Sequence, residues 1–264
     1  MHPMLTIAVK AARRAANLIQ RKSHNLDIIQ TDKKGHNDFV SEVDREAERL
    51  IIETIRDAYP THAILAEESG AYQIGESEYE WLIDPIDGTT NYLHGYPHYA
   101  VSIALVCKGQ ITLGVVYDPV RNDLFTAEKG GGAYLNDRRI RVGRRIQLSD
   151  ALITTGFPCS DTSYLDTYLG MFADMIRKTA GVRREGSAAL DLCYVASGRA
   201  DGFWELNLKP WDIAAGALIV QEAGGIVTNP VGEEGWLESG DIVAANPKIL
   251  GQMLATLAPH TGAN

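Results

Sequence analysis

The first third of the chain carries two helical patterns of apolar residues. In residues 4–22 and again in residues 42–58, apolar side chains recur every three or four positions, as on one face of an amphipathic helix. The first face comprises Leu5, Ala8, Val9, Ala12, Ala16 and Ile19, and the second comprises Val43, Ala47, Leu50, Ile51 and Ile55. Pro60 lies just beyond the second pattern. We therefore predict two helices there.

Short apolar runs then replace the helical patterns. They predict strands at 63–66, 81–84, 100–107, 111–117 and 123–127. Lys108-Gly109-Gln110 is typical of a hairpin turn between two of these strands, and the three glycines 130–132 indicate another turn.

The remainder of the chain alternates strands with helices. Strands are expected at 151–157, 202–205 and 241–245, and helices at 164–179, 187–197 and 210–222. Asn246-Pro247 has the residue types of a helix cap and first turn, so a final helix should begin there. This alternation indicates a layered α/β or α+β architecture. We expect two halves, residues 1–148 and 149–264, within one compact unit.

Composition and charge narrow the class of protein. A chain of 264 residues with 45% hydrophobic and 22% charged residues is long enough to bury a sizeable core. Its net charge of −9 argues against general binding to nucleic acid or to an anionic membrane. Neither a signal peptide nor an apolar run of the roughly 20 residues that span a bilayer is apparent. The scattered cysteines, Cys107, Cys159 and Cys193, suggest reduced thiols and a cytoplasmic location.

The chemistry is concentrated after the strand at 81–84, in the stretch WLIDPIDGTTNY (81–92). Asp84 and Asp87 are two like charges beside an apolar run, and such charges are costly to bury without a cation. Pro85 restricts the backbone between them, which leaves the carbonyl of Ile86 available as a further oxygen ligand. Hard oxygen donors of this kind suit magnesium, and the following turn, with its exposed amides, suits an anion.

Other acidic positions have plainer explanations when each is taken alone. Asp44 could be an exposed helix residue, Glu67-Glu68 a solvated turn, and Asp212 a helix cap. An isolated Asp-Pro-x-Asp-Gly is itself most often a simple turn. The joint occurrence of these acidic residues and the Asp-Pro-x-Asp-Gly motif favours a shared site for divalent cations and phosphate.

Three segments together resemble a known family. ILAEESG (64–70), WLIDPIDGTTNY (81–92) and WDIAAGALIVQEAGG (211–225) are similar, in order and spacing, to the signatures of the inositol monophosphatase family. VVYDPVRNDLFTA and GSAALDLCYVASGRADGF resemble its bacterial SuhB subgroup in particular. The resemblance implies an α+β fold, a layered αβαβα sandwich of the inositol monophosphatase and fructose-1,6-bisphosphatase type.

The same resemblance implies roles for individual residues. Two or three Mg²⁺ ions would be held by carboxylates and one carbonyl, and a threonine paired with an aspartate would orient and deprotonate a metal-bound water. The implied ligands are Glu67, Asp84, Ile86, Asp87 and Asp212, and the implied catalytic residues are Asp44, Thr89 and Glu67. The implied substrate contacts are Asp87, Gly88, Thr89, Ser187, Ala188, Glu205 and Asp212. A family lysine would correspond to Lys33 or Lys34.

The implied activity is Mg²⁺-dependent hydrolysis of inositol 1-phosphate and related polyol phosphates by in-line attack of water. The family also implies sensitivity to lithium and a homodimer. The SuhB subgroup further implies a regulatory role in antitermination on ribosomal RNA, through RNA polymerase and the NusA factor. Exposed arginines could serve that role, namely Arg138, Arg139, Arg141, Arg183 and Arg184, although the run RRIRVGRR (138–145) could equally be a solvated hairpin.

Two alternatives remain open from the sequence. A related phosphatase acting on fructose bisphosphate or a 3′-phosphorylated nucleotide shares the Asp-Pro-x-Asp-Gly-Thr core. A regulatory binding protein with vestigial phosphatase activity would keep the fold but not the turnover.

Overall fold

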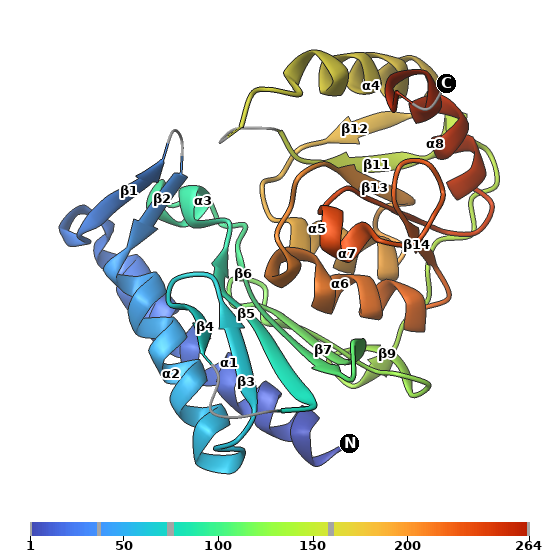
Figure 1. Cartoon of the computed structure of the whole chain (residues 1–264). Helices are drawn as coiled ribbons and strands as arrows, with labels where there is room; N and C mark the ends of the chain where they lie inside the picture. Colours follow the sequence, from blue (N-terminus) through green and yellow to red (C-terminus); the bar gives the residue numbers. More distant parts are fainter. Residues whose placement is uncertain (1, 36–37, 73–76, 158–160, 263–264) are drawn as a thin grey trace.

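Two β-sheets stacked between layers of helices form the framework of the molecule (Figure 1). The computed structural model describes residues 2–35, 38–72, 77–157 and 161–262. In that part of the chain, no helix is both long enough and apolar enough to cross a membrane.

The larger sheet has eight strands in the order β10-β9-β8-β7-β6-β5-β3-β4. Its members are β3 (Ala63–Ala66), β4 (Gly70–Tyr72), β5 (Tyr79–Asp87), β6 (Ala100–Cys107), β7 (Gln110–Asp118), β8 (Asp123–Glu128), β9 (Gly132–Leu135) and β10 (Arg138–Arg139). All of its pairings are antiparallel except that of β3 with β5, which is parallel. Consequently β3 and β5 both end at the same edge of the sheet.

The smaller sheet has five strands in the order β12-β11-β13-β15-β14. They are β11 (Leu152–Thr155), β12 (Gly181–Arg183), β13 (Gly202–Glu205), β14 (Ile226–Thr228) and β15 (Ile242–Ala245). A separate hairpin pairs β1 (Thr31–Gly35) with β2 (Asp38–Ser41).

Helices fill three layers around the sheets. They are α1 (Pro3–Lys22), α2 (Glu42–Ala58), α3 (Thr89–Leu93), α4 (Leu165–Lys178), α5 (Ala188–Ala196), α6 (Pro210–Glu222), α7 (Trp236–Ser239) and α8 (Leu250–Leu257), with short 3-10 turns at Ser23–Ile28, Leu148–Asp150 and Ala258–His260. Helices α1 and α2 cover one face of the large sheet, α5 and α6 lie between the sheets, and α4 and α8 cover the far face of the small sheet. The αβαβα layering is confirmed.

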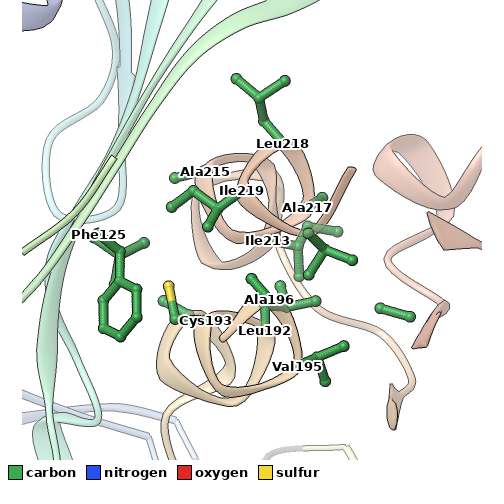
Figure 2. Close-up of a cluster of buried hydrophobic side chains, with 14 of the residues drawn as sticks. Phe125, Leu192, Cys193, Val195, Ala196, Ile213, Ala215, Ala217, Leu218 and Ile219 are labelled. Carbon is green, nitrogen blue, oxygen red and sulfur yellow. The ribbon is translucent and has the colours of Figure 1, made fainter. Parts of the chain in front are cut away.

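Helix α6 is the centre of the middle layer. Every residue from Ile213 to Val220 is buried. Figure 2 shows Ala215 and Ile219 on the side of α6 that faces Phe125 of β8, and Ile213 on the opposite side. Gly114 of β7 makes this approach possible, because a Cβ there would lie 2.7 Å from the carbonyl oxygen of Ala215. The helix therefore lies directly against the large sheet.

The expected elements are present, and the ends of three differ appreciably from the expectation. The strand expected at 81–84 is longer and spans Tyr79–Asp87. The strand at 151–157 is limited to Leu152–Thr155. The last helix begins at Leu250 rather than at Pro247, because Asn246 Oδ1 accepts the amides of Lys248 and Ile249 and so closes a turn before the helix. The hairpin β1–β2 and the short strands β4, β9, β10, β12 and β14 were not anticipated from the sequence.

The expectation of reduced thiols concerns three cysteines. Cys107 and Cys193 are free thiols, and Cys193 is buried. Cys159 lies outside the described residues.

Candidate active site

The two aspartates of the Asp-Pro-x-Asp motif lie at the end of β5. Residues three apart on a regular strand point to opposite faces of a sheet. The pairing of β5 with β6 is irregular between Asp84 and Asp87, since Asp84 opposes Ser102 and Asp87 opposes Ala100. This bulge adds one residue, which returns Asp87 to the face that Asp84 uses. Asp84 is buried, and its Oδ1 accepts the amide of Ile86 at 2.9 Å.

Glu67 reaches the same edge from the neighbouring strand. It follows β3, and its amide donates to the carbonyl of Ile83 on β5 at 3.1 Å, so the parallel pairing continues to this residue. The turn after it is held by Glu48 of α2, whose two carboxylate oxygens accept the amides of Glu68 and Ser69 at 2.8 and 2.9 Å. Glu48 thereby fixes the backbone that carries Glu67.

Thr89 and Asp44 form the expected pair. Thr89 Oγ1 lies 2.8 Å from Asp44 Oδ1 and 3.0 Å from the carbonyl oxygen of Ile86. A hydroxyl group has one hydrogen, and the charged acceptor makes the stronger bond, so donation to Asp44 is favoured. Thr89 Oγ1 lies beside one lone pair of the Ile86 carbonyl oxygen, and the second lone pair is available for a ligand.

Asp44 is also part of the first turn of α2. Its Oδ2 accepts the amide of Ser41 at 2.9 Å and also the hydroxyl of Ser41, while Ser41 Oγ accepts the amides of Val43 and Asp44, which completes a capping box. The carboxylate is fully buried, and burial raises its pKa in spite of these hydrogen bonds. One side chain therefore serves both the helix start and the site.

Asp212 comes from the second half of the chain. It lies in the first turn of α6, and its Oδ2 accepts the amide of Lys209 at 2.8 Å. The preceding residue is tied to the large sheet, since Ser102 Oγ of β6 donates to the carbonyl of Trp211 at 3.0 Å. These bonds place the start of α6 beside the end of β5.

The acidic side chains interact strongly with one another. Burial raises the pKa of Asp84 well above its usual value, and repulsion from Glu67, Asp87 and Asp212 raises it further. Burial, opposed by hydrogen bonds, raises the pKa of Asp87 to about 6. Burial and repulsion from Asp87 likewise raise the pKa of Asp212. The four residues therefore share one negatively charged site.

The donor set fits magnesium in kind. Every donor is a hard oxygen, and four of them are carboxylates. Burial and repulsion from neighbouring carboxylates raise the pKa values of Asp84, Asp87 and Asp212, which a bound cation would reverse. Among the described residues, no three His, Cys, Asp or Glu side chains are as close as ligands of one ion must be. Like charges repel, so we expect the side chains to close when a cation enters.

The expected substrate contacts lie around Asp87. Ser187 Oγ and the amide of Ala189 donate to Asp87 Oδ2 at 2.6 and 2.7 Å, and Ala188 lies between them. Glu205 ends β13, and burial together with repulsion from Asp87 raises its pKa to about 8. Its carboxylate lies against Gly156, where a Cβ would be 1.8 Å from Oε1.

The arginines that could serve partner binding do not lie together in the structure. Arg138 and Arg139 form the edge strand β10 and are exposed, as is Arg141, so the structure does not bring them to the acidic site. Arg183 ends β12 and is exposed. Arg184 is near the site, because its charge lowers the pKa of Glu205 and of the buried Asp191. The side chains of Lys33 and Lys34 lie outside the described part of the structure.

Several supporting residues could not be recognised from the sequence. Ser41, Glu48, Asn91 and Asp191 each contact or face the site. One signal was available for Glu48: it follows Asp44 by four residues, so two acidic side chains fall on one face of α2 beside the apolar Val43 and Ala47.

The fold is a layered α+β sandwich, and its candidate site gathers carboxylate and carbonyl oxygens at the end of β5. The chain belongs to the inositol monophosphatase family, whose sequence model matches residues 1–262.

Individual relatives are similar along almost their whole length. The Nus factor SuhB of Pseudomonas aeruginosa is 53% identical over 264 residues, which cover 98% of this chain and 97% of the relative. The crystal structure of the extragenic suppressor protein suhB from Bartonella henselae is 42% identical, with a TM-score of 0.95 and full coverage of both chains. The inositol monophosphatase from Anabaena sp. PCC 7120 is 39% identical, with a TM-score of 0.85 and coverage of 97% and 95%.

Proposed function

We propose that this protein is a magnesium-dependent phosphomonoesterase that hydrolyses inositol 1-phosphate and related polyol phosphates. The observation that carries the proposal is the hydrogen bond from Thr89 to the buried Asp44, beside Asp84, Asp87 and Asp212, whose pKa values are raised by burial and by repulsion from neighbouring carboxylates. The similarity to the Anabaena inositol monophosphatase supports the same activity.

Glu67, Asp84, Asp87, Asp212 and the carbonyl of Ile86 would hold the ions. Magnesium, when bound, neutralises charge on the phosphate oxygens and lowers the pKa of water. Two or three ions would suit this number of oxygen donors.

The Thr89–Asp44 pair then acts as the base. Thr89 Oγ1 accepts a proton from the attacking water while its own hydrogen passes to Asp44 Oδ1. Burial strengthens Asp44 as a base, because it raises the pKa of the carboxyl group toward the operating pH. The water attacks phosphorus in line as the bond from phosphorus to the inositol oxygen breaks. The leaving alkoxide takes a proton from a second water molecule, and the amides of Gly88 and Thr89 would orient the phosphate.

Ser187, Ala188 and Glu205 would contact the polyol. A carboxyl group forms hydrogen bonds with hydroxyl groups whether it is charged or protonated, and Glu205 is close enough to Asp87 for this neighbour to raise its pKa. A polyol, which offers several hydroxyl donors, suits this acidic wall better than a nucleobase does. Fructose bisphosphate is disfavoured as well, because its second phosphate would meet further acidic groups.

Phosphate release measures this function directly. We expect release from inositol 1-phosphate in the presence of magnesium, and much slower release from adenosine 3′,5′-bisphosphate or fructose 1,6-bisphosphate. Asp87→Asn should abolish magnesium-dependent turnover while circular dichroism shows an intact fold. Near-normal turnover by this variant would refute the assignment of Asp87 as a ligand.

A second function is favoured by the relatives' names. We infer that the protein also acts as a regulatory factor in transcription antitermination, since a relative that is 53% identical is a Nus factor SuhB. The exposed arginines of the 138–145 segment are a positive patch on a chain with a net charge of −9, which suits an acidic partner or RNA. Binding to NusA or RNA polymerase should survive Asp87→Asn and weaken when Arg138, Arg139 and Arg141 are replaced by Ser.

A further inference from the structure

The side chain of Asn91 joins the two halves of the chain beside the candidate active site. Asn91 lies in α3, two residues after Thr89. Its Nδ2 lies 2.8 Å from the carbonyl oxygen of His98, 2.8 Å from that of Glu185 and 3.4 Å from that of Gly186. An amide group has two hydrogens, so the two short contacts account for both of its donors.

The joint between the halves has no room for additional atoms. A Cβ on Gly88 would lie 3.0 Å from the carbonyl oxygen of Gly186 and 3.1 Å from that of His98. A Cβ on Gly186 would lie 2.9 Å from the guanidinium of Arg184 and 3.0 Å from Asn91 Nδ2. The turn after β5 and the segment 185–187 therefore approach through their backbones, and the side chain of Asn91 bonds across the joint.

The segment that Asn91 holds leads directly to the substrate contacts. The hydroxyl of Ser187 and the amide of Ala189 donate to Asp87, which ends β5 four residues before Asn91. Asp87 and Asn91 are thus two anchors for one stretch of chain. The anchor at Asp87 is a charged group that the proposed function assigns to a cation, whereas the anchor at Asn91 is neutral and bonds only backbone carbonyls.

We propose that Asn91 is a positioning residue, which fixes the 185–189 segment against the turn after β5 and so sets where Ser187 and Ala188 meet the polyol of the substrate. This inference rests on the proposed function. It predicts a specific effect on the sugar part of the substrate rather than a general loss of activity.

Two variants distinguish the loss of the hydrogen-bond donor of Asn91 from the loss of its side-chain volume. Asn91→Asp keeps the size but directs a carboxylate oxygen at two carbonyl oxygens, and Asn91→Ala removes the contact. Asn246→Ala is the matched control, because Asn246 is also an asparagine that holds a loop through its side chain. Asn246 follows β15, which pairs antiparallel with β13, and Ala245 lies opposite Gly202 while Ile242 lies opposite Glu205. Asn246 is therefore beside the end of β13 that is far from Glu205.

The first measurement is steady-state kinetics with two substrates at saturating magnesium. Inositol 1-phosphate offers hydroxyl groups to Ser187 and Ala188, whereas 4-nitrophenyl phosphate offers none. For both Asn91 variants we expect KM for inositol 1-phosphate to rise by about tenfold or more, and KM for 4-nitrophenyl phosphate to change by less than about twofold. Asn246→Ala should change neither KM, although it should lower the melting temperature.

The second measurement is hydrogen exchange of the metal-free protein. Loss of the anchor should accelerate exchange in the peptide that contains the amide of Ala189 by about tenfold in the Asn91 variants, relative to peptides from α6. This readout does not require activity. If the wild type fails to hydrolyse inositol 1-phosphate, the proposed function is wrong and the exchange result alone decides whether Asn91 anchors the segment.

Three results would overturn the inference. They are unchanged exchange around Ala189, an equal rise in KM for both substrates, and effects in Asn246→Ala that match those of the Asn91 variants.

Discussion

Replacing Asp44 by Asn tests the chemical role of this residue with minimal change in shape. Both oxygens of the wild-type carboxylate accept hydrogen bonds, Oδ1 from the hydroxyl of Thr89 and Oδ2 from the amide of Ser41. An asparagine can keep only one of these acceptors. The amide of Ser41 cannot turn, whereas the hydroxyl of Thr89 can. The asparagine oxygen should therefore face Ser41, and its NH₂ group should face Thr89.

This orientation preserves the helix start and removes the base. Thr89 would accept a hydrogen bond from the introduced amide group and turn its own hydrogen to the carbonyl of Ile86, which lies 3.0 Å away. It could then no longer pass a proton to the side chain at position 44. Loss of a general base costs about 10²–10⁴-fold in rate, so we expect kcat to fall at least about 100-fold with little change in KM.

Stability should change little, for two opposing reasons. The charge-assisted bond from Ser41 becomes a neutral one, which costs up to about 1 kcal/mol. Burial of a negative charge is relieved at the same time, as the raised pKa of Asp44 indicates. Urea unfolding should therefore give a free energy within about 1 kcal/mol of the wild-type value.

Ser41→Ala is the control for the helix start. It removes the hydroxyl of the capping box and leaves the Thr89–Asp44 bond in place. We expect a loss of about 1 kcal/mol in stability with at most a few-fold loss in kcat. The reasoning is refuted if Asp44→Asn keeps kcat within about threefold of wild type, or if Ser41→Ala loses as much activity as Asp44→Asn does.

Other parts of the site allow three further tests. Glu48→Ala removes the acceptor for two amides of the turn that follows Glu67. We expect the free energy of unfolding in urea to fall by about 2–4 kcal/mol and the magnesium concentration needed for activity to rise several-fold. Unchanged magnesium activation would contradict the role of Glu48. Gly156→Ala places a methyl group on the carboxylate of Glu205, so KM for inositol 1-phosphate should rise about tenfold, and an unaltered KM would show that Glu205 does not contact the substrate. The pKa of Glu205 is about 8 in the folded protein, and its usual value is 4.5. Between these two pH values the folded protein binds more protons than the unfolded chain, so its stability falls as pH rises. Melting temperatures in EDTA should accordingly fall between about pH 4.5 and 8, and a flat or rising profile over this range would exclude this contribution.

Apolar segments that are bounded by turn residues could be predicted from the sequence because their signal is local. The helix at 210–222 and the strands at 63–66, 100–107 and 202–205 agree with the structure to the residue. The strands β12 and β14 have three residues each, which are too few to show a pattern. The hairpin β1–β2 begins with the polar TDKKG, which lacks the alternation of a half-buried strand.

The principal acidic residues could be proposed from motifs, whereas the residues that hold them in place could not. Asp84 and Asp87 belong to one short motif, and Glu67 and Asp212 were noticed as further acidic positions whose ligand roles came from the family resemblance. Glu48 contacts amides 20 and 21 residues away, and Asn91 contacts a carbonyl 94 residues away. Both bond to backbone atoms, which every residue possesses, so neither partner leaves a mark in the sequence.

The burial of α6 has a consequence for how the protein loses its activity. Asp212 is carried by the helix that both halves enclose, and Gly114 brings that helix against the sheet without an intervening side chain. Such a helix cannot detach while the rest of the molecule stays folded. Thermal inactivation and global denaturation should thus be a single cooperative event, with no partly melted species that has lost turnover but kept its core.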